Sequence, residues 1–390
     1  MYQVKIKITF FLLGSLLGFL AWGNDIALTL LSPLLFLVYF RTEKRLNLYL
    51  FTLGYYLASS RGLLIGTYKY YSDINIALIL WMSVAILVSL PWIIFWSKSI
   101  KRRYLYFPLA LAASILPPFG FIAWSNPLPS AGLIFPGSGF LGMILLLGLV
   151  YGVSYLIDRA KWDNMLHLKL IVFFSLIMTF GLGVSKLNNP KGSEIDATET
   201  AFKYDPDKPD RLKDFIRISK YLEIASASPK KEILLPENAL GFYRESQRVA
   251  WRDLTRSKVI YAGAYIPIAG TKYYDNVLLR VDSNSSKILY RQRVPVPVSM
   301  WKPFSDQGAR ATFYKDPTIE INGEKVGVLI CYEQLLTYVM LQTMYYDPKS
   351  IIGISNLYWS QGTSIEQIQR ESLELYGLLF GVDVYFSVNR

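Results

Sequence analysis

The chain has 390 residues, of which 52% are hydrophobic and only 18% are charged, and its formal net charge is +12. This composition excludes a disordered chain and is typical of a membrane protein with an attached soluble domain. Residues 1–189 contain 15 Lys and Arg against 5 Asp and Glu, and residues 190–390 contain 26 against 24, so the net charges of +10 and +2 sum to the total. Because the basic excess lies in the apolar half, it indicates membrane topology, and no direct binding of nucleic acid is expected.

Seven apolar stretches in the first half are long enough, or nearly so, to cross a bilayer, which takes about 20 residues. We therefore predict a transmembrane helical domain over 1–187. The spans are expected near residues 6–22, 26–40, 47–67, 74–97, 104–124, 133–157 and 168–186. A second apolar stretch follows the first within three residues, so the first is predicted as a retained anchor and not as a cleaved signal peptide.

The charges of the connecting loops predict the orientation. Basic residues precede the first and seventh spans and follow the second and fourth, whereas the loops around 23–25 and 125–132 have none. Arg61 and Lys69, near and after the end of the third span, are the exception. By the positive-inside rule the N-terminus is cytoplasmic and the chain after residue 187 is outside. We expect a multi-pass protein of the bacterial inner membrane with a periplasmic soluble domain.

The second half begins with a polar, Pro-rich stretch, which predicts a linker over 188–210. Residues 211–390 then alternate between strand and helix patterns, which indicates a layered α/β or α+β domain. Strands are expected at 232–235, 258–264, 274–282, 287–294, 319–331 and 350–355, and helices at 211–227, 241–255, 332–346 and 363–380.

Cys331, the single cysteine, ends an apolar run over 325–330 that reads as a buried strand. Asn322-Gly323 just upstream is a strong hairpin-turn signal and marks where this strand begins. A residue at the C-terminal end of a strand is well placed to be a nucleophile, although a lone cysteine is also typical of a small buried hydrophobic residue. The one histidine, His167, is far away in the sequence, so a cysteine nucleophile here needs a carboxylate or an amine to activate it.

Two acidic residues follow strands in this pattern. Glu237 comes after the strand at 232–235, and Glu333 comes two residues after Cys331. A glutamate held between apolar strands has a raised pKa and is suited to accept a thiol proton. Glu237 is also consistent with a simple helix cap.

Five stretches resemble the nitrilase (carbon–nitrogen hydrolase) superfamily, and in particular its membrane branch, which includes apolipoprotein N-acyltransferase and TraB-type conjugal transfer proteins. They are residues 235–239, 273–276, 290–297, 327–333 and 355–359, in the order of that family. The resemblance implies an αββα sandwich, C-terminally shortened, with a Glu-Lys-Cys triad and no cofactor. Cys331 would be the nucleophile and Glu237 the general base, and Tyr332, Glu333 and Trp359 would contact substrate.

The chain departs from the pattern of this superfamily at the lysine that stabilises the oxyanion. Gln292 stands at that position, flanked by Arg291 and Arg293. Because side chains alternate along a strand, both arginines face away if Gln292 faces the site, unless a bulge intervenes. Arg293 and the more distant Lys302 are the candidates for oxyanion support. The acyltransferase branch also carries a glutamate shortly after its Val-Pro, where this chain has residues 298–301.

Two functions remain open on the sequence. The first is a thioester-forming acyltransferase or amidohydrolase that acts on a membrane lipid, a lipid-linked substrate or another membrane-adjacent substrate. The second is a catalytically degenerate scaffold of the same fold, which binds other conjugation proteins. A transporter or channel is disfavoured because the predicted spans contain few ionisable residues.

Overall fold

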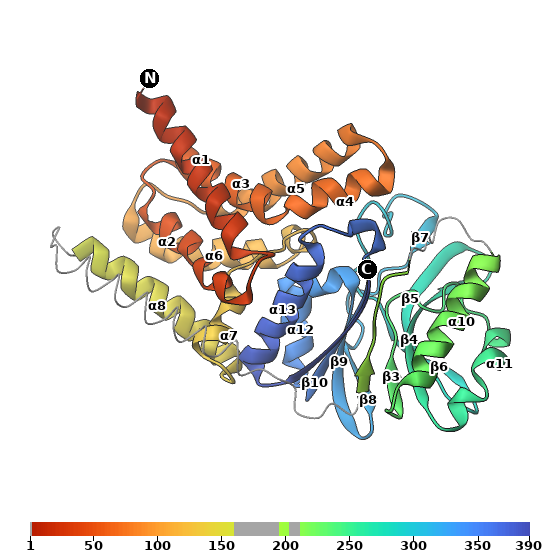
Figure 1. Cartoon of the computed structure of the whole chain (residues 1–390). Helices are drawn as coiled ribbons and strands as arrows, with labels where there is room; N and C mark the ends of the chain where they lie inside the picture. Colours follow the sequence, from red (N-terminus) through yellow and green to blue (C-terminus); the bar gives the residue numbers. More distant parts are fainter. Residues whose placement is uncertain (1, 160–194, 203–210) are drawn as a thin grey trace. The chain divides into compact units, whose positions relative to one another are not determined.

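The computed structural model describes residues 2–159, 195–202 and 211–390 (Figure 1). The chain forms two compact units. The helical unit comprises Met1–Asn189, Leu335–Tyr338 and Gly362–Val382, and the sheet unit comprises Pro190–Gln334, Val339–Gln361 and Asp383–Arg390. The predicted seventh span at 168–186 and His167 lie outside the described residues.

The helical unit contains three helices that are long and apolar enough to cross a membrane, counted over the described residues. These segments are Val4–Ala21, Ile74–Ile94 and Gly139–Ile157. Its helices are α1 (Tyr2–Ala21), α2 (Leu34–Arg41), α3 (Arg45–Ser59), α4 (Arg61–Tyr71), α5 (Ile74–Ile94), α6 (Ile100–Ile115), α7 (Ala131–Ile134), α8 (Gly139–Arg159) and α13 (Ile365–Phe380). The total of seven spans stays a prediction.

Four of the predicted spans are not continuous helices. The stretch at 104–124 extends beyond α6, which ends at Ile115, and the stretch at 133–157 is divided between α7 and α8. The stretch at 26–40 is a 3-10 helix, Ile26–Leu31, followed by α2, because Pro33 has no N–H to continue the first helix. The stretch at 47–67 is divided between α3 and α4 at Ser60, whose backbone leaves the helical conformation. Serines and a glycine surround this break, and both residue types have low helix propensity.

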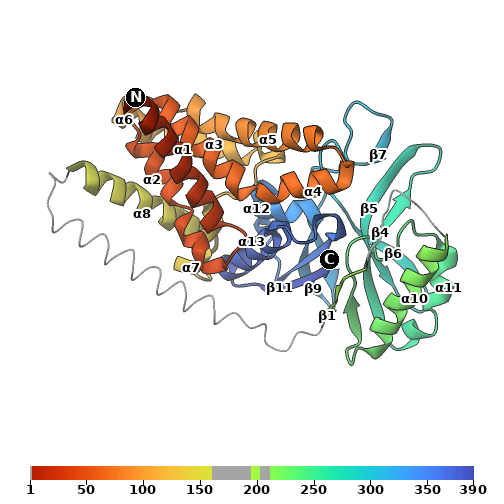
Figure 2. The same cartoon turned by 45° about the horizontal axis from the view of Figure 1, so that its top comes forward.

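Helices α1 and α3 lie side by side (Figure 2). Glycines make this contact possible: a Cβ atom on Gly14 or Gly18 of α1 would come within 2.0 and 2.2 Å of carbonyl oxygens of α3. Gly54 on α3 faces the carbonyl oxygen of Phe11 in the same way, at 2.3 Å. The spacing of four between the α1 glycines is the small-residue pattern that lets apolar helices approach closely.

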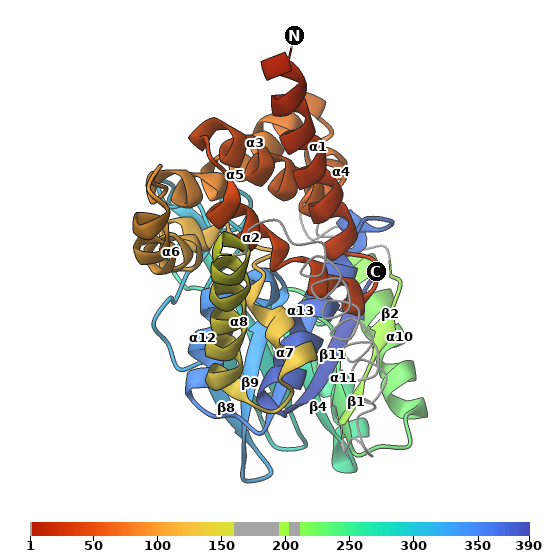
Figure 3. The ribbon, with the colours of Figure 1, turned by 90° about the vertical axis from the view of Figure 1, so that its left-hand side faces the viewer.

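Helix α13 comes from the last 30 residues of the chain, yet it packs in the helical unit beside α7 and α8 (Figure 3). A Cβ on Gly132 of α7 would lie 2.3 Å from the carbonyl oxygen of Leu375. One turn before Leu375, Glu371 of α13 accepts a hydrogen bond from the backbone N–H of Gly23 at 2.9 Å. The sequence predicted this helix correctly but placed it in the soluble domain.

The sheet unit contains two mixed sheets. Over the described residues, one sheet has the order β1-β3-β4-β5-β6, with β7 paired to β5, and the other has the order β2-β11-β10-β9-β8. The strands are β1 (Ile195–Ala197), β2 (Glu199–Thr200), β3 (Glu232–Leu234), β4 (Val259–Pro267), β5 (Lys272–Val281), β6 (Ser286–Arg291), β7 (Gln307–Ala309), β8 (Thr318–Ile321), β9 (Glu324–Ile330), β10 (Ser350–Asn356) and β11 (Asp383–Asn389).

Helices cover the sheets and bury a core on each. Helix α10 (Arg211–Ala227) and the short α11 (Arg248–Trp251) share a buried cluster with β3, β4 and β5. Helix α12 (Thr337–Tyr345) covers the other sheet, where Thr343 packs against Gly327 of β9. This layering is the predicted αββα arrangement.

Two predictions for this unit were wrong. Part of the predicted linker at 188–210 forms β1 and β2, each of which joins a different sheet. The predicted helix at 241–255 is reduced to α11 and two 3-10 turns. The chain before α11 is held in extended form instead, since the N–H of Tyr243 donates to the carbonyl oxygen of Tyr265 on β4.

The parallel pairings bring strand ends together. β3 pairs in parallel with β4, and β9 and β10 pair in parallel in the second sheet. Glu237 follows β3, Cys331 follows β9, and Asn356 ends β10. The residues after the carboxyl ends of these strands form the candidate site.

Candidate active site

Cys331 stands at the sharp turn where β9 enters a 3-10 helix over Cys331–Leu335. Its φ angle is 52°, in the left-handed region that side-chain-bearing residues rarely adopt. The residue is also buried, with 5% of its surface exposed. Strained backbone of this kind is concentrated at functional sites, and here it holds the thiol at a fixed position at the strand end.

The backbone of β4 fixes the turn that carries Glu237. The N–H of Gly263 donates to the carbonyl oxygen of Pro236, and a Cβ on Gly263 would lie 2.4 Å from the Cα of Glu237. Only glycine allows two backbone segments to approach this closely. Asn238, the next residue, has a φ angle of 57° and completes the turn.

The side chain of Glu237 meets the thiol. Its carboxylate accepts hydrogen bonds from Nδ2 of Asn276 at 2.7 Å, from the backbone N–H of Asn356 at 3.0 Å and from the side chain of Cys331. Burial is the largest influence on the carboxyl group and raises its pKa above the ordinary value, although the three hydrogen bonds oppose this shift. A buried carboxylate with a raised pKa that contacts a thiol is arranged to take its proton.

Gln292 faces the same site. Its Nε2 donates to the carbonyl oxygen of Ile330 at 2.9 Å, and its Oε1 accepts from Nδ2 of Asn276 at 2.9 Å. Asn276 therefore bridges Glu237 and Gln292 with the two hydrogens of one amide group. A neutral amide thus stands at the position where the resemblance predicts a lysine.

The arginines beside Gln292 point elsewhere. Arg291 pairs with Asp275 at 2.8 Å. Arg293 is fully buried and donates to Tyr290 and to side chains of α12, which accept at 2.7 to 2.8 Å. The alternation of side chains predicted this orientation, and the candidate role of Arg293 in oxyanion support stays a prediction.

Lys302 lies further along the chain, on the segment between β6 and β8. Its side chain is partly exposed, and it makes no hydrogen bond or ion pair within the described part of the chain. Its candidate role in oxyanion support stays a prediction.

Glu333 is fully buried behind the Cys331 turn. Its carboxylate accepts hydrogen bonds from the Tyr290 hydroxyl and from the backbone N–H groups of Ile330, Arg293 and Val294, at 2.6 to 3.2 Å. Burial raises the pKa of this carboxyl, and Arg293 opposes the shift. These donors reach both oxygens, so the carboxylate supports the turn, and its contact with substrate stays a prediction.

The other two predicted substrate contacts flank the site. Tyr332 follows Cys331 directly, and Trp359 follows β10, where its Nε1 donates to the carbonyl oxygen of Asn356 at 3.1 Å. Both side chains are partly exposed. Their contact with substrate stays a prediction.

The sequence reasoning did not identify Asn276 and Asn356, which hold Glu237. Asn276 does lie in one of the five stretches that carry the resemblance, and that was the available signal. No group of three or more His, Cys, Asp or Glu side chains suited to a metal ion occurs in the described ranges. The groups brought together at the candidate site are the thiol, one carboxylate and neutral amides.

No protein-family model matches this chain. Among curated proteins, the probable conjugal transfer protein TraB of Sinorhizobium fredii is 31% identical over 396 residues, which cover 95% of each chain. The conjugal transfer protein TraB of Agrobacterium fabrum is 30% identical over 398 residues, which cover 97% of this chain and 91% of the relative. The chain belongs to the TraB family. The likeness extends over the helical unit as well as the sheet unit, because it covers nearly the whole length.

Solved structures that match this TraB-family chain cover only part of it. A variant of the Nesterenkonia AN1 amidase from the nitrilase superfamily is 16% identical, covers 51% of this chain and 78% of its own, and gives a TM-score of 0.37. An amidase from Nesterenkonia sp. is 15% identical over 50% of this chain and 75% of its own, with a TM-score of 0.36.

Proposed function

We propose that this chain is an inner-membrane component of conjugal transfer whose periplasmic domain carries out acyl chemistry on Cys331. The hydrogen bond between the Cys331 thiol and the buried carboxylate of Glu237 carries the proposal. A thiol at a strained strand end, paired with a carboxylate of raised pKa, is an activated nucleophile that needs no histidine and no cofactor. The substrate is a lipid-linked or membrane-adjacent amide or ester.

In each half of the proposed reaction Glu237 accepts one proton and gives it up again, so it ends as a carboxylate. The carboxylate takes the proton of the thiol as the sulfur attacks the substrate carbonyl and forms a C–S bond. The protonated Glu237 gives this proton to the leaving amine or alcohol as the substrate bond breaks. An amine or water then attacks the thioester and passes its proton to Glu237, and the departing sulfur recovers it.

The side-chain amide of Asn276 donates hydrogen bonds to both Glu237 and Gln292, and so holds these two side chains in place during both steps. Gln292 leaves this position without the ammonium group that the lysine of the superfamily would supply to an oxyanion. Removal of one oxyanion donor lowers rates by about two to three orders of magnitude in other enzymes, so we expect slow turnover.

Gln292 also favours a second function, a scaffold that has kept the fold and lost catalysis. Its amide is hydrogen-bonded on both sides within the protein, as in a structural polar network. In this case the chain would contribute surfaces to the other conjugation proteins, and the thiol would be a buried residue without a chemical role.

An acyl-transfer assay separates the two functions. The full chain in lipid nanodiscs is incubated with a fatty acyl p-nitrophenyl ester, and intact and peptide masses are recorded before and after hydroxylamine. The enzyme proposal predicts an acyl adduct on Cys331 that hydroxylamine removes, and no adduct in Cys331→Ala. A folded wild-type chain without an adduct on Cys331 would support the scaffold.

A further inference from the structure

Residues 297–316 form an arm of the sheet unit, and this arm begins five residues after Gln292 of the candidate site. The arm follows β6, carries β7 and leads into β8, and β7 pairs in parallel with β5. Its backbone is fastened at several points: Ala309 donates to Met300 at 2.8 Å, Arg310 to Tyr274 at 2.9 Å, and Thr312 to Arg293 at 3.0 Å. The arm therefore has a defined shape.

The arm exposes large hydrophobic side chains. Phe304 is 102% exposed and Tyr314 is 94% exposed. The rings of Trp301 and Phe313 pack edge to face with their centroids 5.1 Å apart, and this contact links the two parts of the arm that carry them. Val298 is also exposed and has a φ angle of 71°, a strained conformation for a β-branched residue. Single exposed apolar residues are ordinary, so a binding role for these three depends on the charges that accompany them.

Two lysines accompany the aromatic residues. Lys302 and Lys315 form no ion pair within the described ranges, whereas Asp306 of the arm pairs with Lys272 at 3.5 Å. The carboxylate of Asp316 accepts from the backbone N–H of Thr318 at 2.8 Å. Arg310 of the arm pairs with Asp275 at 2.7 Å, so the charges of the two lysines are the ones available to a partner.

We propose that the arm binds the membrane surface, with Phe304 and Tyr314 in the interfacial layer and Lys302 and Lys315 at lipid phosphates. Aromatic residues with adjacent lysines are the composition that proteins use at this layer. The scattered side chains of the arm lack the contiguous apolar core of a protein interface. The same chain carries three helices of membrane-spanning length, so a bilayer is the partner that its tethered domain meets.

The consequence for the site rests on the proposed function. The arm returns to the sheet at Arg293, the residue after Gln292. A lipid held by the arm would therefore be delivered next to the chain segment that lines the site of Cys331. This would make lipids or lipid-linked molecules the class of substrate.

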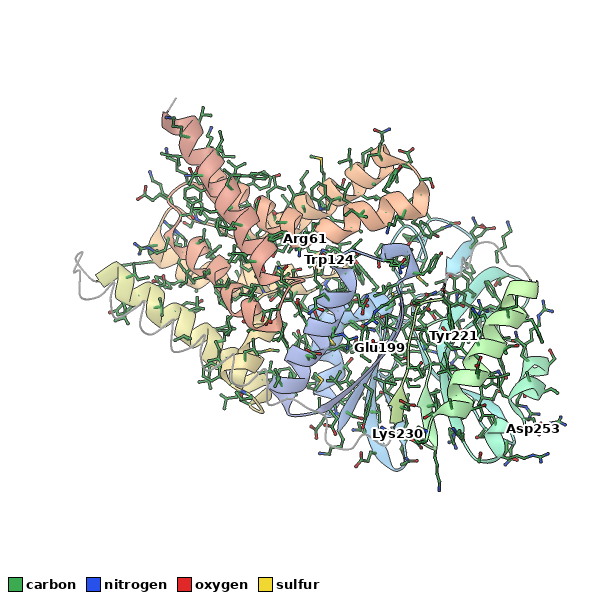
Figure 4. The ribbon with its side chains drawn as sticks, viewed as in Figure 1. Arg61, Trp124, Glu199, Tyr221, Lys230 and Asp253 are labelled. Atoms are coloured by element: carbon green, nitrogen blue, oxygen red, sulfur yellow. The ribbon has the colours of Figure 1, made fainter. Side chains whose placement is uncertain are left out.

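Site-specific quenching tests the proposal. In full-length Cys331→Ala, which has no other cysteine, Phe304→Cys and Tyr314→Cys are each labelled with the fluorophore NBD and placed in nanodiscs of phosphatidylglycerol and phosphatidylethanolamine. Asp253→Cys is the control, because this residue is fully exposed on the sheet unit near α11 (Figure 4). Nitroxide-labelled lipids should remove most of the fluorescence at 304 and 314 and little at 253, while iodide in the buffer should do the reverse.

Two results would overturn the proposal. Equal quenching by iodide at all three positions would mean that the arm stays in water. Protection of 304 and 314 from both quenchers would mean that protein covers the arm. Because the background lacks the thiol, either result leaves the acyl chemistry of Cys331 to its own assay.

Discussion

The buried carboxyl group of Glu371 on α13 predicts that the free energy of unfolding falls as pH rises. Its carboxyl group is fully buried in the helical unit, where it accepts hydrogen bonds from the backbone of Gly23 at 2.9 Å and from Nε2 of Gln367 at 3.2 Å. Burial raises its pKa from 4.5 to about 7, and the guanidinium of Arg61, labelled in Figure 4, interacts with it across the loop. In the unfolded chain the carboxyl group returns to its ordinary pKa.

The pH dependence follows from these two pKa values. Between pH 4.5 and 7 the folded protein holds a proton that the unfolded chain has released, so the free energy of unfolding falls as pH rises through this window. A shift of 2.5 units, the difference of the two values, corresponds to a loss of about 3 kcal/mol. Glu371→Gln mimics the protonated acid and removes this loss. The variant should be only slightly more stable than the wild type at pH 5, and its advantage should approach the full amount at pH 8.

Thermal unfolding of the full chain in nanodiscs from pH 5 to pH 8 measures the effect. Glu366→Gln on the same helix is the matched control, because that side chain is 25% exposed and its carboxylate lies 3.7 Å from Arg370. The control should keep the pH slope of the wild type. A Glu371→Gln variant with an unchanged slope, or with lower stability at every pH, would refute the assignment of the titration to this carboxyl.

Three further predictions concern the site and the helical packing. Glu237→Gln should lower cleavage of an acyl p-nitroanilide by about two to four orders of magnitude but affect a p-nitrophenyl ester less, because nitrophenolate leaves without a proton; equal losses on both substrates would contradict a role for Glu237 in protonating the leaving group. Gln292→Lys should shift the midpoint of Cys331 alkylation by iodoacetamide to lower pH, since a neighbouring ammonium stabilises the thiolate; an unchanged midpoint would mean that the lysine does not reach the thiol. Gly132→Ala should destabilise the helical unit in thermal unfolding, because its Cβ would lie 2.3 Å from a carbonyl oxygen of α13, whereas Gly148→Ala, with nothing within 4 Å, should not.

The sequence predicted the parts of the fold that depend on local patterns. The Asn322-Gly323 turn is confirmed, with φ angles of 54° and 80° that suit a tight hairpin between β8 and β9. The helical stripe of α13 was equally clear, but its packing partners are far away in the sequence. The predicted helix at 241–255 failed because pairing of Tyr243 with β4 overrides the local periodicity.

The sequence predicted those residues of the candidate site that directly follow a strand. Cys331 and Glu237 both follow apolar runs, and the alternation rule gave the orientation of Arg293. The role of Asn276 depends on the pairing of β5 with its neighbours, and that of Asn356 on the approach of the two sheets. Both contacts join residues that are far apart in the chain, so a single sequence contains no local pattern that predicts them.

The plasmid transfer frequency of Cys331→Ser, measured with the abundance of the protein, is the direct test of a chemical role for the thiol. Transfer should collapse at normal abundance, and Glu237→Gln should have the same effect, while Gly148→Ala should transfer like the wild type. Unchanged transfer by Cys331→Ser would contradict a chemical role for the thiol and leave the scaffold as the function of the domain.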